Sequence, residues 1–222
     1  MKGRYIFVIG ILALSLVGFD FLGFAYHSWH QKMTVEVEVN GQLYSGSSVV
    51  EMTVFGHPDI PLVSGNRDLD MRGEAVVVEL PDNQYLFALL TYNAFFASKV
   101  FHDKMDGALS ESGERWAKII SELEETREIE SKDYPLLVTF SDITDPKTIK
   151  KVDQGNLIAN FGQGMSLKRI TLEITDDDVT EGKIEQVLPC LRSGRACVPL
   201  NRDLPYGDLM SNILNSAFWR PK

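Results

Sequence analysis

Two cysteines are the first residues of this sequence that could do chemistry. Cys190 and Cys197 are the only cysteines among its 222 residues. Two thiolates alone cannot complete a four-ligand zinc site, and redox pairs usually show the shorter Cys-x-x-Cys spacing. We therefore predict a disulfide bond between Cys190 and Cys197, on the condition that this part of the chain is exported to an oxidising compartment.

The histidines are the next candidates for chemistry, and there are four: His27, His30, His57 and His102. No H-x-x-x-H or H-E-x-x-H spacing occurs, so the sequence predicts no metal site. His57 precedes Pro58 in a segment with loop composition, and it is the best single candidate for a general base, with Asp59 beside it as a further binding candidate. The competing interpretation of His57 is a solvated loop histidine.

Aspartates form the third group that could bind a ligand. The run from Asp176 to Asp178, with Asp142, Asp145 and Asp153 upstream, lacks the D-x-D-x-D-G-x5-E pattern of a calcium loop. Acidic residues at a helix start cap free N–H groups, which explains the run without a metal. No G-x-S-x-G or S-x-x-K signature is present either, so we predict no catalytic residue and no cofactor.

The N-terminal segment decides the compartment. Lys2 and Arg4 precede an apolar run over residues 5–26, interrupted by Asp20. At 1.5 Å per residue such a helix is long enough for the ~30 Å hydrocarbon core, and the positive charge before it favours a cytoplasmic N-terminus. We expect a single-pass inner-membrane anchor or signal segment over 1–30 and an exported domain over 31–222. The alternative is a signal peptide cleaved near Ala25, which leaves a soluble periplasmic protein.

The exported part begins with strand signals. From Met33 the residues alternate between apolar and polar, and Asn40-Gly41 is typical of a two-residue hairpin turn. The Gly-, Pro- and Asp-rich segment 56–73 indicates an irregular excursion. A second strand-turn-strand unit follows around Pro81-Asp82-Asn83, and its apolar return strand is expected to be central and covered on both faces.

Helical periodicity appears later in the chain. We expect amphipathic helices over 110–130 and 179–191. The C-terminal segment 207–219, if helical, gathers Leu209, Ile213, Leu214 and Phe218 along one side. Further strands are expected around 136–140 and 167–175. Strands first, followed by helices mixed with strands, indicate an α+β domain with a mainly antiparallel sheet and packed amphipathic helices.

Charge excludes one class of partner. The formal net charge of -9 and the pI near 5.0 argue against a nucleic-acid-binding protein, which needs a basic face to neutralise phosphates. A polybasic membrane-surface protein is disfavoured for the same reason.

Three stretches carry a resemblance: "RGEAVVVELPDNQYLFALL", "YPLLVTFSDITDPKTIKKVD" with "NLIANFGQGMSLKRITLEITDDDVT", and "KIEQVLPCL". Over about residues 72–192 the chain resembles a group of uncharacterised exported or membrane-anchored proteobacterial proteins. The resemblance implies a lineage and a common fold. It implies no reaction, because the group has no assigned activity.

Two functional hypotheses remain. The first is a membrane-anchored periplasmic binding or assembly module, with an envelope protein as its partner. The second is a periplasmic hydrolase of unrecognised type that uses the 56–73 loop, with His57 and Asp59 as its candidates. Because no catalytic motif is present, the first hypothesis is preferred and an enzyme is the less favoured of the two.

Overall fold

The structure is a computed structural model, and it describes residues 25–56, 67–91, 95–108, 115–193 and 213–220 together with Cys197, Asp203, Pro205 and Leu209. Two antiparallel sheets and a few short helices make up this part of the chain. The predicted α+β class and the mainly antiparallel pairing are confirmed. Of the anchor or signal segment expected over 1–30, residues 1–24 lie outside the described residues and residues 25–30 belong to a strand. No helix among the residues described is long and apolar enough to span a membrane.

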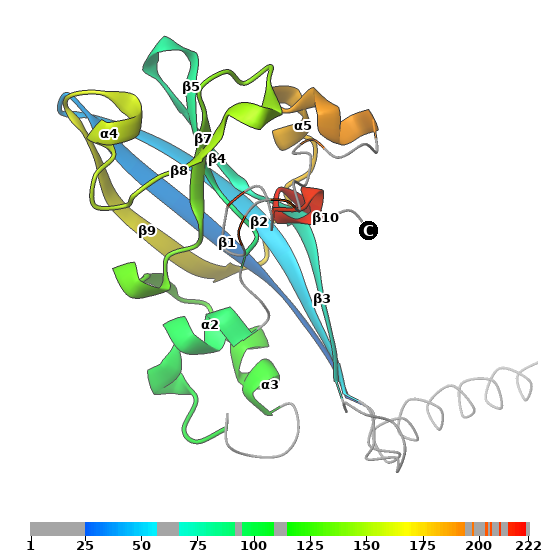
Figure 1. The fold of residues 1–222 in the computed structure, drawn as a ribbon. Coiled ribbons are helices and arrows are strands. Elements are labelled where there is room, and N and C mark those ends of the chain that lie inside the picture. Colours follow the sequence, from blue (N-terminus) through cyan, green and yellow to red (C-terminus); the bar gives the residue numbers. More distant parts are fainter. Residues whose placement is uncertain are drawn as a thin grey trace, which may run out of the picture.

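The larger sheet has six strands in the order β10-β3-β2-β1-β9-β6. Their bounds are β1 (Ala25–Val39), β2 (Gln42–Gly56), β3 (Arg67–Glu74), β6 (Thr126–Glu128), β9 (Met165–Thr175) and β10 (Trp219–Arg220). Figure 1 shows β1 and β2 as one long hairpin that runs through the whole molecule. Its turn has Asn40 at φ 51° and Gly41 at φ 84°, the positive values that a two-residue hairpin requires, so the predicted turn is confirmed.

The first strand is longer than the sequence pattern suggested. β1 begins at Ala25 rather than near Met33, within the stretch that we assigned to the anchor. Alternation continues upstream: Trp29, Gln31 and Met33 are buried, whereas the residues between them are only partly buried. The apolar start of the segment masked this period of two.

The excursion expected over 56–73 is partly wrong. Residues 57–66 lie outside the described residues, but Arg67–Glu74 forms β3, which pairs with β2 from Gly56↔Arg67 to Glu51↔Arg72. Pairing with the edge of β2 supplies the backbone hydrogen bonds that a Gly- and Asp-rich composition alone does not suggest. His57 and Asp59 therefore have no described position.

The smaller sheet has the order β4-β5-β7-β8. Its strands are β4 (Val76–Leu80), β5 (Gln84–Ala88), β7 (Leu137–Phe140) and β8 (Ile149–Lys151). Leu86 and Phe87 of β5 are fully buried, which confirms the predicted central strand. The backbone of β4 crosses β2 at Gly46, where a Cβ atom would collide with the Val77 carbonyl group. This close crossing brings the two sheets together, with the core between them.

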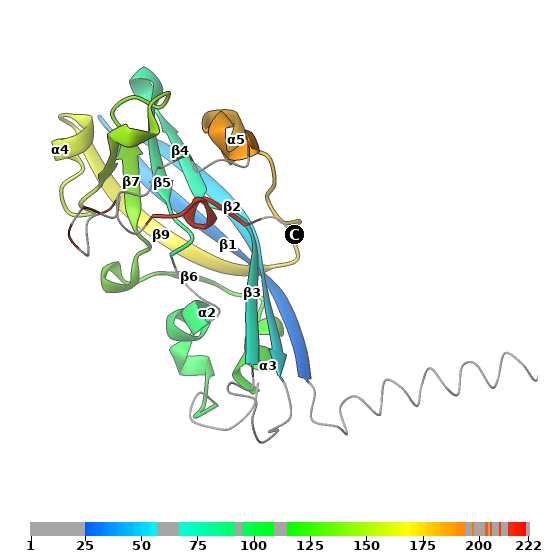
Figure 2. The ribbon, with the colours of Figure 1, turned by 45° about the vertical axis from the view of Figure 1, so that its right-hand side comes forward.

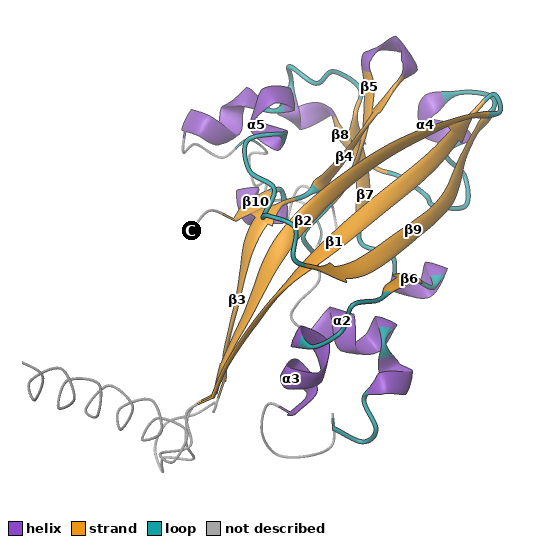
Figure 3. Cartoon of the chain, turned by 180° about the vertical axis from the view of Figure 1, so that it is seen from behind, coloured by secondary structure: helices purple, strands orange, loops and turns teal. Residues whose placement is uncertain are grey.

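Two helices close one end of the core. α2 (Phe95–Val100) and α3 (Arg115–Ser121) cover the inner face of the hairpin there, and the rings of Trp116 and Trp29 make a T-shaped contact with centroids 6.0 Å apart. Seen from behind, the strands of the larger sheet lie in front of the smaller sheet (Figure 3). The helix expected over 110–130 is shorter than predicted. Residues 126–128 instead form β6, because the edge of β9 offers backbone partners there.

The remaining helices are short as well. α4 (Ile158–Phe161) ends at Gly162, and α5 (Ile184–Val187) is all that the structure has of the helix predicted over 179–191. Pro189 cannot continue an α-helix, and a 3₁₀ turn follows. Further 3₁₀ turns are Pro81–Asn83, His102–Lys104, Ser131–Asp133, Pro146–Thr148 and Asn215–Ala217. The expected C-terminal stripe is wrong at Leu214, which is 53% exposed, whereas Phe218 is fully buried.

Candidate functional site

Three strand ends meet at one end of the larger sheet. Ala25 lies opposite Gly56, and Gly56 lies opposite Arg67. Figure 2 shows these ends of β1, β2 and β3 together, next to α3. The chain between Gly56 and Arg67, which includes His57 and Asp59, therefore leaves and rejoins the sheet at the end where β1 begins. The sequence prediction for these two residues remains untested.

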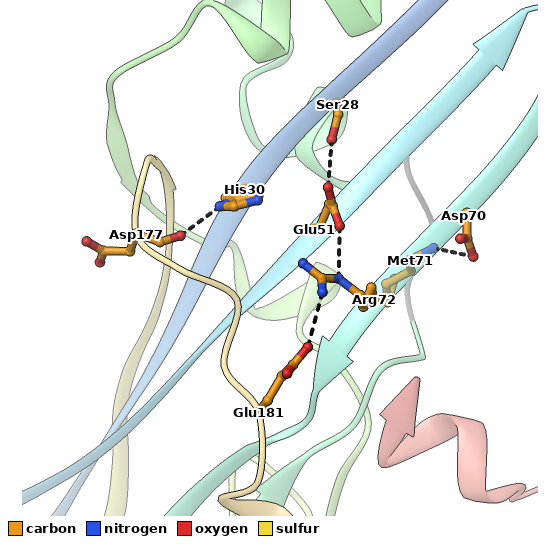
Figure 4. A network of polar contacts seen from close by, with 8 residues as sticks. All are labelled: Ser28, His30, Glu51, Asp70, Met71, Arg72, Asp177 and Glu181. Carbon is orange, nitrogen blue, oxygen red and sulfur yellow. Dashed lines mark hydrogen bonds and ion pairs between the residues drawn. The ribbon is translucent and has the colours of Figure 1, made fainter. Parts of the chain in front are cut away.

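A network of polar side chains lies on the outer face of the same three strands (Figure 4). His30 of β1 lies opposite Glu51 of β2, which lies opposite Arg72 of β3. Residues directly opposite one another in an antiparallel sheet share a face, so the register places the three side chains in one row. Ser28, two positions before His30, faces the same way.

Glu51 is the centre of this network. It accepts a hydrogen bond from the Ser28 hydroxyl at 3.3 Å and one from the Arg72 Nε at 2.9 Å. Arg72 also donates its Nη1 to Glu181 at 3.2 Å, from the segment that follows β9. The side chains of Arg72 and Glu51 are 26% and 28% exposed, so water screens the pair only in part.

The network contains the residue types of a Ser-His-acid triad without the hydrogen bonds of one. In a triad the serine hydroxyl donates to the histidine, and the histidine donates to the acid. Here the Ser28 hydroxyl donates directly to Glu51, and the Nδ1 of His30 donates to the backbone carbonyl of Asp177 at 2.7 Å. This arrangement holds strands and a connecting segment together, and it does not activate the serine.

The connecting segment 176–183 is fastened to the sheet at several points. Lys32 donates to the Asp177 carboxylate at 2.9 Å, and this hydrogen bond lowers the pKa of Asp177 and raises the pKa of Lys32. Thr180 exchanges hydrogen bonds with the backbone of Val49 on β2. We had expected the aspartate run to cap a helix, and this prediction is wrong.

The cap of α5 comes from a distant strand instead. Glu74, at the end of β3, accepts hydrogen bonds from the backbone N–H groups of Gly182, Lys183 and Ile184. Glu74 is only 1% exposed. An N-terminal turn leaves N–H groups without helical partners, and a carboxylate satisfies them while opposing the helix dipole.

The upstream aspartates serve local turns. Asp142 accepts the N–H and hydroxyl of Thr144, and these bonds lower its pKa. Asp145 accepts the N–H of Lys147 at 3.0 Å, and Asp153 accepts that of Gly155 at 2.9 Å. Within the described residues, no group of three or more His, Cys, Asp or Glu side chains is arranged to hold a metal ion.

Cys190 and Cys197 are bonded to each other, with their Cα atoms 5.3 Å apart. Cys190 lies in the 3₁₀ turn that follows α5, and Cys197 is 4% exposed. The backbone N–H of Cys197 donates to the Asn215 side chain at 2.9 Å, which ties the bridge to the turn before β10. The predicted disulfide is thus present in the structure.

Two neighbouring grooves lie beside α2 and the start of β7. A groove of about 650 Å³ and one of about 360 Å³ share Lys132, Tyr134 and Pro135 as walls. Burial raises the pKa of Tyr134, and Lys132 is paired with Glu130 at 2.6 Å.

Sequence reasoning missed Ser28, His30, Glu51 and Arg72 as a group. Their alternation with apolar neighbours was the available signal, but only the strand register joins them across three segments. No protein-family model, curated protein or solved structure matches this chain. The resemblance to uncharacterised exported proteins stays a prediction.

Proposed function

We propose that this chain is a membrane-anchored periplasmic binding or assembly module, held in the inner membrane by residues 5–26 and docking an envelope protein partner. The observation that carries the proposal is the pattern of hydrogen bonds in the polar network. Ser28, His30 and Glu51 have the residue types of a catalytic triad, and all three bind strands or the 176–183 segment.

Two further observations support the proposed location. A disulfide bond such as Cys190–Cys197 persists in oxidising compartments, of which the periplasm is one. β1 begins at Ala25, so its first two residues are the last two of the apolar run 5–26, and an anchored chain would pass from the bilayer into the sheet without a linker. The domain would then lie at the membrane surface, with the Ala25, Gly56 and Arg67 ends of β1, β2 and β3 nearest the bilayer.

The hydrolase alternative gains no specific support. Part of the 56–73 loop is strand β3, and its candidates His57 and Asp59 lie outside the described residues. We therefore propose no enzymatic activity. We prefer an uncleaved inner-membrane anchor to a signal peptide cleaved near Ala25. Cleavage there would still leave most of strand β1 in place.

A topology experiment tests the location. A reporter enzyme that is active only in the periplasm, fused after Lys222, should be active, and the fusion should stay with the membranes in alkaline carbonate. Intact-mass measurement should find the N-terminal segment retained. Activity of a strictly cytosolic reporter at the same position, or a mass that begins after residue 25, would contradict the anchored topology.

A co-purification experiment tests the assembly role. The full chain and a control with only residues 1–30 fused to the same tag are isolated from membranes in mild detergent. A partner of the domain should remain with the full chain and not with the control. Equal protein content in both samples would count against an assembly module.

A further inference from the structure

β3 is paired along its length on one side only. β2 pairs with it from Arg67 to Arg72, whereas β10 pairs with its other side only at Gly73 and Glu74. In the part of the chain that the structure describes, no strand pairs with this second side from Arg67 to Arg72. We call this stretch the β3 edge.

Hydrogen bonds on β2 show in which direction the backbone N–H and C=O groups of the β3 edge point. The N–H and C=O of Val49 both bond to Thr180, at 2.9 and 3.0 Å, so they face away from β1. Backbone groups alternate sides along a strand, so those of Met52 face β1. Met71 lies opposite Met52, and its backbone groups therefore point outward from the β3 edge.

A side-chain contact agrees with this assignment. The Met71 N–H donates to the carboxylate of Asp70 at 2.9 Å (Figure 4). By the same alternation the backbone groups of Leu69 also point outward. Unpaired N–H and C=O groups on an edge strand are a template for another strand, and a neighbouring carboxylate satisfies one donor only until such a strand arrives.

The side chains of the β3 edge specify what can add to it. Asp68 and Asp70 lie on the outer face of the sheet and are exposed, whereas Leu69 lies on the inner face and is 41% exposed. Opposite charges directly across an antiparallel pair stabilise it, and like charges destabilise it. A matching strand therefore alternates basic residues, opposite the aspartates, with apolar residues that cover Leu69.

A second copy of this chain is a poor match. Antiparallel pairing of two β3 edges places Asp68 opposite Asp70 of the second copy in one register, and in the next register it places Asp70 opposite Asp70 with Asp68 opposite Arg72. A shift that sets Asp70 opposite Arg72 would bring Leu69 to Gly73, where β10 already lies. Each of these registers thus keeps an Asp–Asp pair or meets β10, whereas a foreign basic strand places no acidic residue opposite Asp68 or Asp70.

We infer that the β3 edge receives an extended, basic segment of a partner protein as an added strand. This inference rests on the proposed assembly role and names its docking mode, β-strand addition, in which backbone hydrogen bonds provide affinity and alternate side chains provide specificity.

Peptide probes test the docking mode with the full chain in detergent micelles. One hexapeptide alternates valine with lysine, a second alternates valine with glutamate, and a third is the lysine peptide with alternate backbone nitrogens methylated. The lysine peptide should bind about tenfold more tightly than the glutamate peptide. It should also slow hydrogen exchange of the Leu69 amide, and the methylated peptide should do neither.

A charge reversal provides the matched control. Asp70→Lys changes an exposed side chain whose described partner is the neighbouring Met71 N–H, and Asp68→Lys added to it changes a second exposed side chain that has an interaction within the chain. Thermal unfolding confirms that each variant is folded, and both the single and the double variant should shift the preference toward the glutamate peptide. Equal binding of the lysine and glutamate peptides, binding of the methylated peptide, or an unchanged preference in the double variant would each overturn the inference. Failure of the proposed function would appear separately, as an inactive periplasmic reporter or release by carbonate, with the peptide result unaffected.

Discussion

The carboxylate of Glu74 accepts a hydrogen bond from the backbone N–H of Ile184 at 3.0 Å, joining the end of β3 to the start of α5. The same carboxylate accepts the N–H groups of Gly182 and Lys183. Because Glu74 lies where the chain passes from the larger to the smaller sheet, its bonds hold the start of α5 at this junction. A single buried side chain thus positions the segment that leads to the disulfide.

Replacing this carboxylate should destabilise the domain. Glu74→Gln keeps one acceptor oxygen but loses the charge and the second acceptor for three N–H groups, and we expect a loss of about 2 kcal/mol in the free energy of unfolding. Urea denaturation measures it. Glu79→Gln on β4 is the control, because Glu79 is exposed and should change stability by less than about 0.5 kcal/mol. Equal effects of the two substitutions would refute the capping role.

Local sequence signals predicted the turns of this fold well. Asn40 and Gly41 adopt the positive φ angles that their hairpin needs, and Asp82 and Asn83 do so at φ 58° and 57°. Such turns depend on the conformational preferences of the residues within them, which the sequence states directly. The central position of β5 followed in the same way from its apolar composition.

The errors arose where distant segments decide the outcome. Thr126–Glu128 follows a helical pattern but pairs with β9 as a strand, and the Gly- and Asp-rich β3 is held by β2. The cap of α5 comes from Glu74 rather than from the neighbouring aspartates. Register and long-range capping of this kind leave no signal within a short window of sequence.

Gly46 should tolerate no side chain. A Cβ atom there would collide with the backbone carbonyl of Val77, which cannot move without separating β4 from β2. We expect Gly46→Ala to cost about 3 kcal/mol, measured by thermal and urea unfolding. Gly155→Ala is the matched control, since its Cβ would meet only Asp153 at 3.5 Å. A stable Gly46→Ala variant would show that the sheets do not cross here.

The Lys32–Asp177 pair should make stability depend on pH. The Lys32 hydrogen bond lowers the pKa of Asp177 in the folded state, so the pair contributes fully above the unfolded pKa and its contribution is lost as pH falls below about 4. The raised pKa of Lys32 predicts a second loss as pH rises above about 10.

Asp177→Asn should weaken both dependences. Both side chains are partly exposed, so the effect should be small and should shrink in high salt. Melting temperatures between acidic and alkaline pH, at two salt concentrations, measure it. Asp178→Asn serves as the control and should follow the wild-type profile. A wild-type profile for Asp177→Asn as well would mean that the pair does not form in solution.

The proposed topology predicts which end of the domain lies near lipid. Tyr26 and Leu43 are 63% and 54% exposed, and they lie about 40 Å apart along the hairpin. Because the native cysteines are bonded to each other, Tyr26→Cys and Leu43→Cys each provide one thiol for a spin label. In vesicles, oxygen from the lipid phase should relax the label at 26, and a water-soluble paramagnetic ion should relax the label at 43. Equal relaxation of both labels by the water-soluble ion would argue against the membrane-proximal position of Ala25.

The disulfide should stabilise the domain without being essential for folding. Cys190 and Cys197 are separated by seven positions, and closing so short a loop is worth about 2.5 kcal/mol in the chain-entropy model, a fraction of a typical domain's ~5 to 15 kcal/mol. Cys190→Ala with Cys197→Ala should therefore lower the melting temperature by several degrees, about 2 to 4 °C per kcal/mol for a domain of this size, and leave a cooperative transition. Alkylation of the native, non-reduced protein is the direct check. No thiol should react before reduction and two should react after it, whereas two reactive thiols in the native protein would remove the bridge and the support that it gives to a periplasmic location.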